Sequence, residues 1–109
     1  MSYKVKTIPK FDRDVKRLAK KYPSLKNEFF ELIQNLKLNP ELGKLIGNNC
    51  YKIRLGIASK GKGKSGGARI ITYFQITDTT VFLLSIYDKS EQENIPDKDL
   101  TELLKFIPE

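Results

Sequence analysis

Cationic side chains without acidic neighbours are the residues of this sequence best suited to chemistry. Between Gly43 and Thr77 there are seven basic residues and no acidic one, whereas the other 74 positions carry 13 basic and 13 acidic residues. The net charge of +7 therefore comes from one third of the chain. Because a segment of one sign repels itself, it usually faces a negative partner such as nucleic acid, an anionic membrane or an acidic protein. The seven are Lys44, Lys52, Arg54, Lys60, Lys62, Lys64 and Arg69.

Composition excludes several other kinds of site. The sequence has no histidine, which removes Ser-His-Asp and Cys-His nucleophile systems and His-ligated zinc. The single cysteine, Cys50, excludes a disulfide framework and a cysteine metal cluster, so we interpret it as structural. Gly63-Lys64-Ser65 matches the end of a phosphate-binding P-loop, but Ala58 stands where that motif needs glycine. We therefore expect neither a metal nor a cofactor.

Hydrophobic periodicity predicts the elements that position the cations. Residues 3–8 alternate as a strand does, and residues 11–21 repeat at helical spacing. A second helix starts at Leu25 and ends near Asn39-Pro40, which makes a helical hairpin. Strands follow at residues 51–58, 69–76 and 81–87, with a flexible glycine-lysine loop at residues 59–67 and a last helix from Pro96-Asp97.

This order, β-α-α-β-β-β-α, predicts an α+β fold. We expect residues 1–109 to form one domain in which a small, antiparallel-rich sheet packs against the helical hairpin. The strand at residues 81–87 is almost entirely apolar, which is typical of a central strand buried on both faces.

Strand alternation gathers the cations around one face of this sheet. Lys52 and Arg54 share a face, and hairpin pairing brings Arg69 close to them. Lys89 follows the last strand. Each of these residues alone is ordinary for a solvated surface, but together they favour phosphate binding.

The aromatic residues nearest this patch fall on different faces. Tyr73 shares the face of Arg69 and is a candidate for stacking on a base, although a half-buried strand tyrosine is equally common. Phe74, on the other face, is expected in the core. Tyr87 ends the last strand, and we expect it to be exposed.

Two stretches of the sequence resemble a known family. Residues 50–55 (CYKIRL), and residues 59–71 (SKGKGKSGGARII) followed by Tyr73-Phe74, resemble the RelE/HigB branch of the toxins of bacterial toxin–antitoxin systems. The resemblance extends over essentially the whole chain and is most specific in the glycine-lysine loop. It implies a RelE-like fold and a toxin held inactive by a cognate antitoxin protein. The implied activity is that of a ribosome-dependent endoribonuclease, or mRNA interferase, which cuts mRNA in the ribosomal A site.

The resemblance also implies roles for individual residues. Lys52, Arg54, Arg69 and Lys89 take the positions of catalytic residues, while Ile95 stands where RelE proteins have a tyrosine that contacts the scissile region. Tyr87 is the substitute that we expect for that tyrosine. The residues expected to bind RNA or the ribosome are Lys44, Lys60, Lys62, Lys64 and Tyr73.

The chemistry of RNA agrees with these roles. RNA carries its own nucleophile, the 2′-hydroxyl, so an enzyme has only to deprotonate and align it and to stabilise the charged phosphorane. Neighbouring cations disfavour the charged form of a lysine, which makes Lys52 or Lys89 the candidate general base or acid. Arg54 and Arg69 would hold the phosphate by paired hydrogen bonds. The expected product is a 2′,3′-cyclic phosphate, formed without a metal.

Other functions stay open at this point. One is a ParE-like inhibitor of DNA gyrase, and another is a non-catalytic RNA- or ribosome-binding module. A membrane-surface role is disfavoured because the patch lacks exposed apolar anchors. No stretch approaches the ~18 apolar residues of a membrane span, the first eight residues lack the apolar core of a signal peptide, and a lone cysteine suits a reducing compartment. We expect a cytoplasmic protein.

Overall fold

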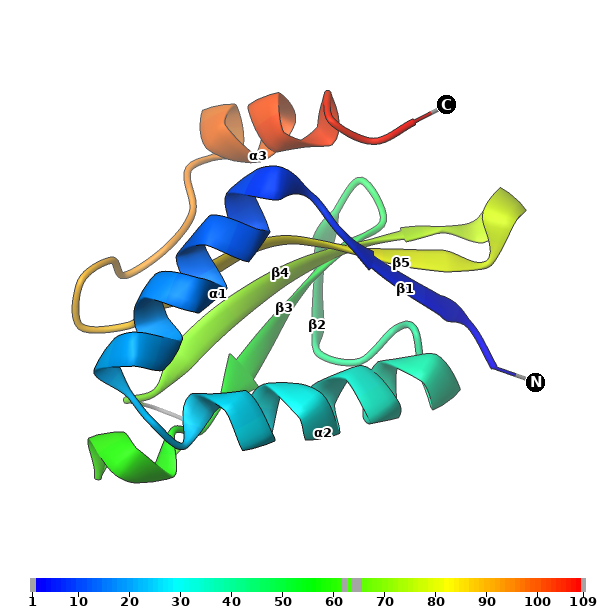
Figure 1. Cartoon of the computed structure of the whole chain (residues 1–109). Coiled ribbons are helices and arrows are strands. Elements are labelled where there is room, and N and C mark those ends of the chain that lie inside the picture. Colours follow the sequence, from blue (N-terminus) through cyan, green and yellow to red (C-terminus); the bar gives the residue numbers. More distant parts are fainter. Residues whose placement is uncertain (1, 62, 64–65, 109) are drawn as a thin grey trace.

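The computed structural model describes residues 2–61, 63 and 66–108. Its main elements are β1 (Lys4–Thr7), α1 (Pro9–Lys21), α2 (Leu25–Leu38), β2 (Lys44–Gly47), β3 (Cys50–Leu55), β4 (Ala68–Gln75), β5 (Thr80–Asp88) and α3 (Asp97–Leu104) (Figure 1). Short 3-10 helices follow β3 and β4 at Ala58–Lys60 and Ile76–Asp78. The predicted α+β class is confirmed. No helix in the described part of the chain is long and apolar enough to span a membrane.

The sheet has five strands in the order β1-β5-β4-β3-β2. β1 pairs with β5 in parallel, and the other three pairings are antiparallel. All nine residues of β5 are buried, which confirms the prediction of a central strand covered on both faces.

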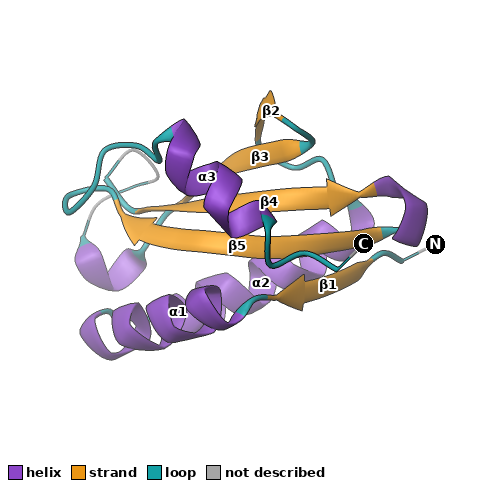
Figure 2. Ribbon diagram, turned by 90° about the horizontal axis from the view of Figure 1, so that it is seen from above, coloured by secondary structure: helices purple, strands orange, loops and turns teal. Residues whose placement is uncertain are grey.

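The helices lie on opposite faces of the sheet. Figure 2 shows α1 and α2 on one side and α3 on the other. Ile53, Ile70 and Ile86 form a buried cross-strand row on the side of α1 and α2. Burying an aliphatic side chain of this size contributes about 1.5–3 kcal/mol, so rows of this kind fix which face of each strand is left for the candidate site.

Two local features differ from the sequence-based predictions. The first helix begins at Pro9, two residues before the predicted start at Phe11, because the first position of a helix needs no N–H donor and therefore accepts proline. The strand β2 was not predicted, because four residues that end in glycine are too short to show an alternating pattern. It pairs with β3 through Lys44 opposite Lys52 and adds a strand at the edge of the sheet.

Gly67 is required where β4 approaches the end of β3. A Cβ atom at this position would lie 2.1 Å from the Leu55 carbonyl oxygen and 3.1 Å from the Gly56 Cα. We expect Gly67→Ala to lower the free energy of unfolding by about 1–3 kcal/mol, because backbone must move to admit the methyl group. Urea unfolding measures this loss. Gly63→Ala is the matched control, since a Cβ there meets nothing within 4 Å; equal midpoints for the two variants would contradict the prediction.

Candidate active site

A row of polar side chains crosses three strands on the face of the sheet that carries α3. Arg54 on β3 lies directly opposite Arg69 on β4, and Arg69 lies opposite Tyr87 on β5. Like charges directly opposite each other destabilise a sheet. Two arginines paired in this way therefore form a site that an anion would stabilise.

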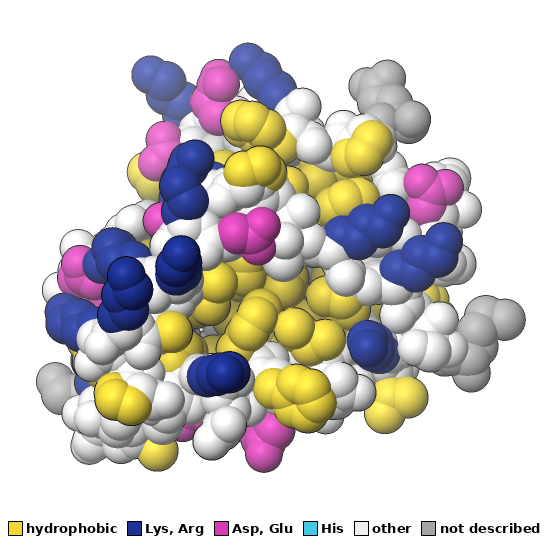
Figure 3. Space-filling view, in the orientation of Figure 1, with side chains coloured by type: hydrophobic (Ala, Val, Ile, Leu, Met, Phe, Trp, Pro, Cys, Tyr) yellow, Lys and Arg dark blue, Asp and Glu magenta, His cyan; other side chains and the backbone are white. Residues whose placement is uncertain are grey.

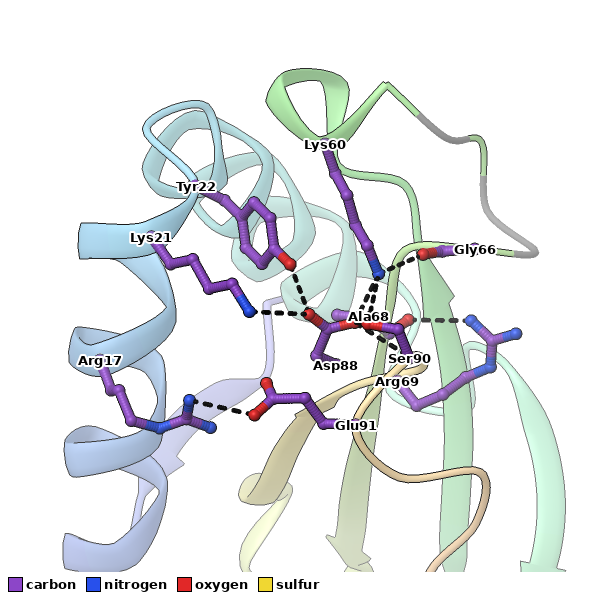
Figure 4. Close-up of polar contacts among 10 residues, drawn as sticks. All are labelled: Arg17, Lys21, Tyr22, Lys60, Gly66, Ala68, Arg69, Asp88, Ser90 and Glu91. Atoms are coloured by element: carbon purple, nitrogen blue, oxygen red, sulfur yellow. Dashed lines mark hydrogen bonds and ion pairs between the residues drawn. The ribbon is translucent and has the colours of Figure 1, made fainter.

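The two arginines differ in their surroundings. Arg54 is exposed, whereas Arg69 is only 5% exposed and its Nη1 donates a hydrogen bond to the Ala68 carbonyl at 3.1 Å. In Figure 4 the Arg69 guanidinium points away from Asp88 and from α1. Arg54 is thus available to an incoming ligand, and Arg69 supplies a second guanidinium from the floor of the same face.

Two lysines border this row. Lys52 lies two residues from Arg54 on the same strand face, and its Nζ is 3.5 Å from the Asn94 Oδ1. The Lys89 backbone N–H donates to the Gly67 carbonyl at 3.0 Å, which extends the β4–β5 ladder by one residue beyond Asp88. The Lys89 ammonium lies 3.7 Å from a Glu93 carboxylate oxygen. The structure therefore places both lysines near the connection that leads from β5 to α3.

Tyr87 is buried, so the prediction that it is exposed is wrong. It lies opposite Arg69 in the β4–β5 ladder, and only 5% of its surface is accessible. Within the described part of the chain its hydroxyl has no hydrogen-bond partner. Burial raises the pKa of that hydroxyl, and the charge of Arg69 only partly offsets the rise. Tyr87 thus presents an unused proton donor beside Arg69.

A groove of about 710 Å³ runs beside these cations, between α2 and the edge of β3. Lys44, Lys52 and Arg54 line one part of it, and the acidic residues Glu28 and Glu31 of α2 line another. The neighbouring strands contribute no acidic residue to this surface, but the structure shows that α2 brings two acidic residues to the wall of the groove. The Glu28 carboxylate is already occupied, because it accepts a hydrogen bond of 2.6 Å from the Ala58 N–H.

Two other predicted residues lie farther from the arginine row. Tyr73 is on the same strand face as Arg69, but four residues along β4, which is about 13 Å in an extended strand. Phe74 is in the core as predicted. Cys50 is fully buried, and burial raises the pKa of its thiol to about 11, which suits a structural residue rather than a nucleophile.

The composition of residues 59–67 predicted that Lys60 extends into solvent from a flexible loop. The structure shows that it does not. It ends the 3-10 helix Ala58–Lys60, and only 9% of its side chain is exposed. Its ammonium forms an ion pair with Asp88 and donates to the Gly66 carbonyl at 2.6 Å (Figure 4). We therefore leave Lys60 out of the RNA contacts proposed below. Lys62 and Lys64 lie outside the described residues.

Asp88 is the centre of this polar cluster. Its fully buried carboxylate also accepts a hydrogen bond of 2.5 Å from the Tyr22 hydroxyl and two from Ser90, at 2.9 Å from the N–H and 2.7 Å from the hydroxyl. Burial alone raises the pKa of Asp88, but the hydrogen bonds from Lys60, Tyr22 and Ser90 outweigh burial and hold that pKa well below its usual range. The cluster fastens the start of the glycine-lysine loop to the end of β5.

Comparison with known families assigns the fold. Residues 11–107 match the model of the family described as the RelE toxin of the RelE / RelB toxin-antitoxin system. The chain belongs to the RelE toxin family.

Solved structures of RelE toxins resemble this chain in fold at low sequence identity. A double-mutant form of the E. coli toxin RelE in the free state is 19% identical, with 99% of this chain and 100% of that chain covered and a TM-score of 0.66. RelE in the intact E. coli RelBE toxin-antitoxin complex is 19% identical over 80% of this chain and 96% of that chain (TM-score 0.62). The RelBE2 toxin-antitoxin complex from Mycobacterium tuberculosis gives 17% identity, 81% and 92% coverage and a TM-score of 0.58. The predicted RelE-like fold is thereby confirmed.

Sequence reasoning missed Asp88 in this RelE-family chain. The only available signal was an acidic residue between Tyr87 and Lys89, at the end of an otherwise apolar strand. Its partners Tyr22 and Lys60 are 66 and 28 residues away along the chain, so no local pattern connects them. Asp88 lies between Tyr87 and Lys89 in the chain. It belongs to the site because its hydrogen bonds hold this part of the backbone in place.

Proposed function

We propose that this RelE-family toxin is a metal-independent endoribonuclease that cleaves translated mRNA on the ribosome. The observation that carries the proposal is the cross-strand row of Arg54, Arg69 and Tyr87, bordered by Lys52 and Lys89, on one face of the sheet. Two facing guanidinium groups match a phosphodiester, whose charge rises as the phosphorane forms.

The reaction needs a proton acceptor, a proton donor and charge stabilisation. The RNA 2′-oxygen attacks the adjacent phosphorus and loses its proton to a general base, for which Lys52 is the candidate. The bond from phosphorus to the 5′-oxygen breaks, and that oxygen takes a proton from Lys89 or from the Tyr87 hydroxyl. Arg54 and Arg69 stabilise the phosphorane, so that no metal ion is needed. The products are a 2′,3′-cyclic phosphate and a 5′-hydroxyl.

The other RNA contacts follow from position. Lys44 lies opposite Lys52 on β2 and extends the cationic surface along the groove, so we assign it to binding of the RNA or ribosome. Tyr73 is too far along β4 to reach the phosphate held by Arg69, and we assign it to a neighbouring nucleotide, where its ring can stack on a base. Lys62 and Lys64 keep the predicted role of ribosome contacts.

The regulatory partner would be an antitoxin protein. Two of the solved relatives are toxin-antitoxin complexes, from E. coli and from Mycobacterium tuberculosis. For this chain we propose that a cognate antitoxin covers the arginine row with an acidic segment, since the opposed like charges of Arg54 and Arg69 favour a negative partner.

Lys52→Arg tests the proton-transfer step. The substitution keeps the positive charge, but arginine does not lose its proton in proteins. We expect binding to mRNA-programmed ribosomes to be unchanged and the cleavage rate to fall by about 100-fold, within the usual contribution of general acid–base catalysis. Single-turnover cleavage on purified ribosomes measures the rate, and a pelleting assay measures binding.

The matched control is Lys26→Arg, an exposed lysine on α2 away from the groove, which should cleave as the wild type does. Unchanged cleavage by Lys52→Arg would contradict the assignment of Lys52 as the base. Growth arrest by the wild-type toxin without any cleavage of mRNA would favour a gyrase inhibitor instead.

A further inference from the structure

A second cationic surface lies on α1, outside the segment between Gly43 and Thr77. Figure 3 shows Lys and Arg side chains gathered over this helix. Five of them, all exposed, line one open groove and recur every three or four residues, which places them on one side of the helix. We call this set the α1 stripe; it consists of Arg13, Lys16, Arg17, Lys20 and Lys21.

The α1 stripe is only partly neutralised. Arg17 lies 3.6 Å from Glu91, and Lys21 lies 4.0 Å from Asp88, whose carboxylate already binds other donors. The other three residues form no ion pair within the described part of the chain; they are Arg13, Lys16 and Lys20. Basic residues in the last turn are common because they complement the helix dipole, but that reason does not apply to Arg13 and Lys16, which lie earlier in α1.

The α1 stripe is separated from the candidate active site by the sheet. α1 lies on the side of the sheet opposite α3 (Figure 2). The Asp88 side chain accepts a hydrogen bond from Tyr22 at the end of α1. Its neighbour Tyr87 and the cross-strand partners Arg69 and Arg54 therefore lie on the other face. The sheet lies between the two surfaces, so one phosphodiester cannot contact both of them. A ligand of the α1 stripe is therefore a different segment from the strand that would be cleaved.

We propose that the α1 stripe binds the phosphate backbone of double-helical RNA. The groove is lined by cations alone, without the apolar and aromatic anchors that protein interfaces and membrane-binding helices use. Surfaces for single-stranded RNA place aromatic rings for base stacking, and the α1 stripe contains none. Cations spaced over about 12 Å of rigid helix instead match the regular phosphates of a duplex, which is recognised by shape and charge.

The test is a triple variant, Arg13→Gln, Lys16→Gln and Lys20→Gln, which keeps good helix formers at exposed positions. The affinity of the full chain for an RNA duplex of about 16 base pairs is measured over a range of salt concentrations. We expect the slope of log affinity against log salt to become shallower by about one for each charge removed, and binding at physiological salt to weaken by at least about 10-fold.

The control variant, Lys4→Gln, Lys6→Gln and Lys26→Gln, removes the same charge from exposed positions outside the α1 stripe. An equal loss of duplex binding in the control would overturn the proposal, because net charge alone would explain the binding. Loss of binding to poly-glutamate with duplex binding unchanged would also overturn it, in favour of an acidic protein partner. An equal loss on a single-stranded RNA of the same length would overturn the assignment to a duplex. None of these measurements uses cleavage, so the result is independent of the proposed nuclease activity.

Discussion

Replacing Lys60 with methionine is expected to lower the free energy of unfolding by about 3–5 kcal/mol, because it leaves a buried carboxylate without its main partner. Asp88 is fully buried and only 9% of the Lys60 side chain is exposed, so water does not replace the lost ammonium. Methionine keeps the unbranched stem, which limits the change to the charge and its hydrogen bonds. Urea unfolding at neutral pH measures the loss.

Lys10→Met is the matched control. It breaks the Lys10–Asp14 pair, whose nitrogen and oxygen are 2.6 Å apart and whose side chains are 46% and 24% exposed, and surface pairs of this kind contribute about 1 kcal/mol or less. Adding Asp88→Asn to Lys60→Met should recover part of the loss, since the unpaired charge is then gone. Equal destabilisation by the two lysine variants would contradict the structure of the Asp88 cluster.

The same pair gives the protein a defined pH dependence. The pKa of Asp88 is held below its unfolded value, so its contribution to stability is complete above pH ~4 and is lost as the pH falls towards the folded-state pKa. In Lys60→Met the largest hydrogen bond that lowers this pKa is absent while burial persists, so the gap between the unfolded and folded pKa narrows and the loss of stability on acidification should be smaller than in the wild type. Free energies of unfolding measured between pH 7 and pH 3 test this difference.

Replacing Arg54 with glutamine is expected to lower activity without lowering stability. The cleavage rate should fall by about 100- to 1000-fold, as it does when one group that stabilises a developing oxyanion is removed. The free energy of unfolding should stay constant or rise by about 0.2–1 kcal/mol, because the substitution relieves the repulsion from Arg69 directly opposite. Arg54 is the better residue for this test because it is exposed, whereas Arg69 is buried.

Single-turnover cleavage and thermal unfolding of the same preparation measure the two effects. Lys4→Gln removes one exposed charge far along the chain from β3 and should change neither quantity appreciably. A loss of activity in Arg54→Gln that is accompanied by a loss of stability would assign Arg54 to the fold and not to the chemistry.

The fold could be predicted from sequence wherever hydrophobic periodicity was long enough to be read. The nine buried residues of β5 and the apolar stripes of α1 and α2 follow directly from their patterns. Residues 44–47 were too short for any pattern, and β2 becomes a strand only because β3 pairs with it. Local sequence contains no information on such pairing, so the edge of the sheet was missed.

The candidate site was also predicted only where a local pattern reveals it. Strand alternation placed Lys52 and Arg54 on one face and paired Arg69 with them, as the register confirms. The glycine-rich composition of residues 59–67 hid the burial of Lys60, because its partner Asp88 is 28 residues away. The α1 stripe was missed because charges were counted along the chain, where Asp12 and Asp14 offset the basic residues, and not around the helix.

The most direct test of the proposed function is analysis of the ends produced from an mRNA bound to purified ribosomes. The wild-type toxin should cut the RNA to leave a 2′,3′-cyclic phosphate and a 5′-hydroxyl. It should not cut the same message when the nucleotide 5′ to the cleaved bond carries a 2′-deoxy sugar. Cleavage of the deoxy-substituted message, or fragments that end in a free 3′-hydroxyl and a 5′-phosphate, would contradict attack by the 2′-hydroxyl at the arginine row.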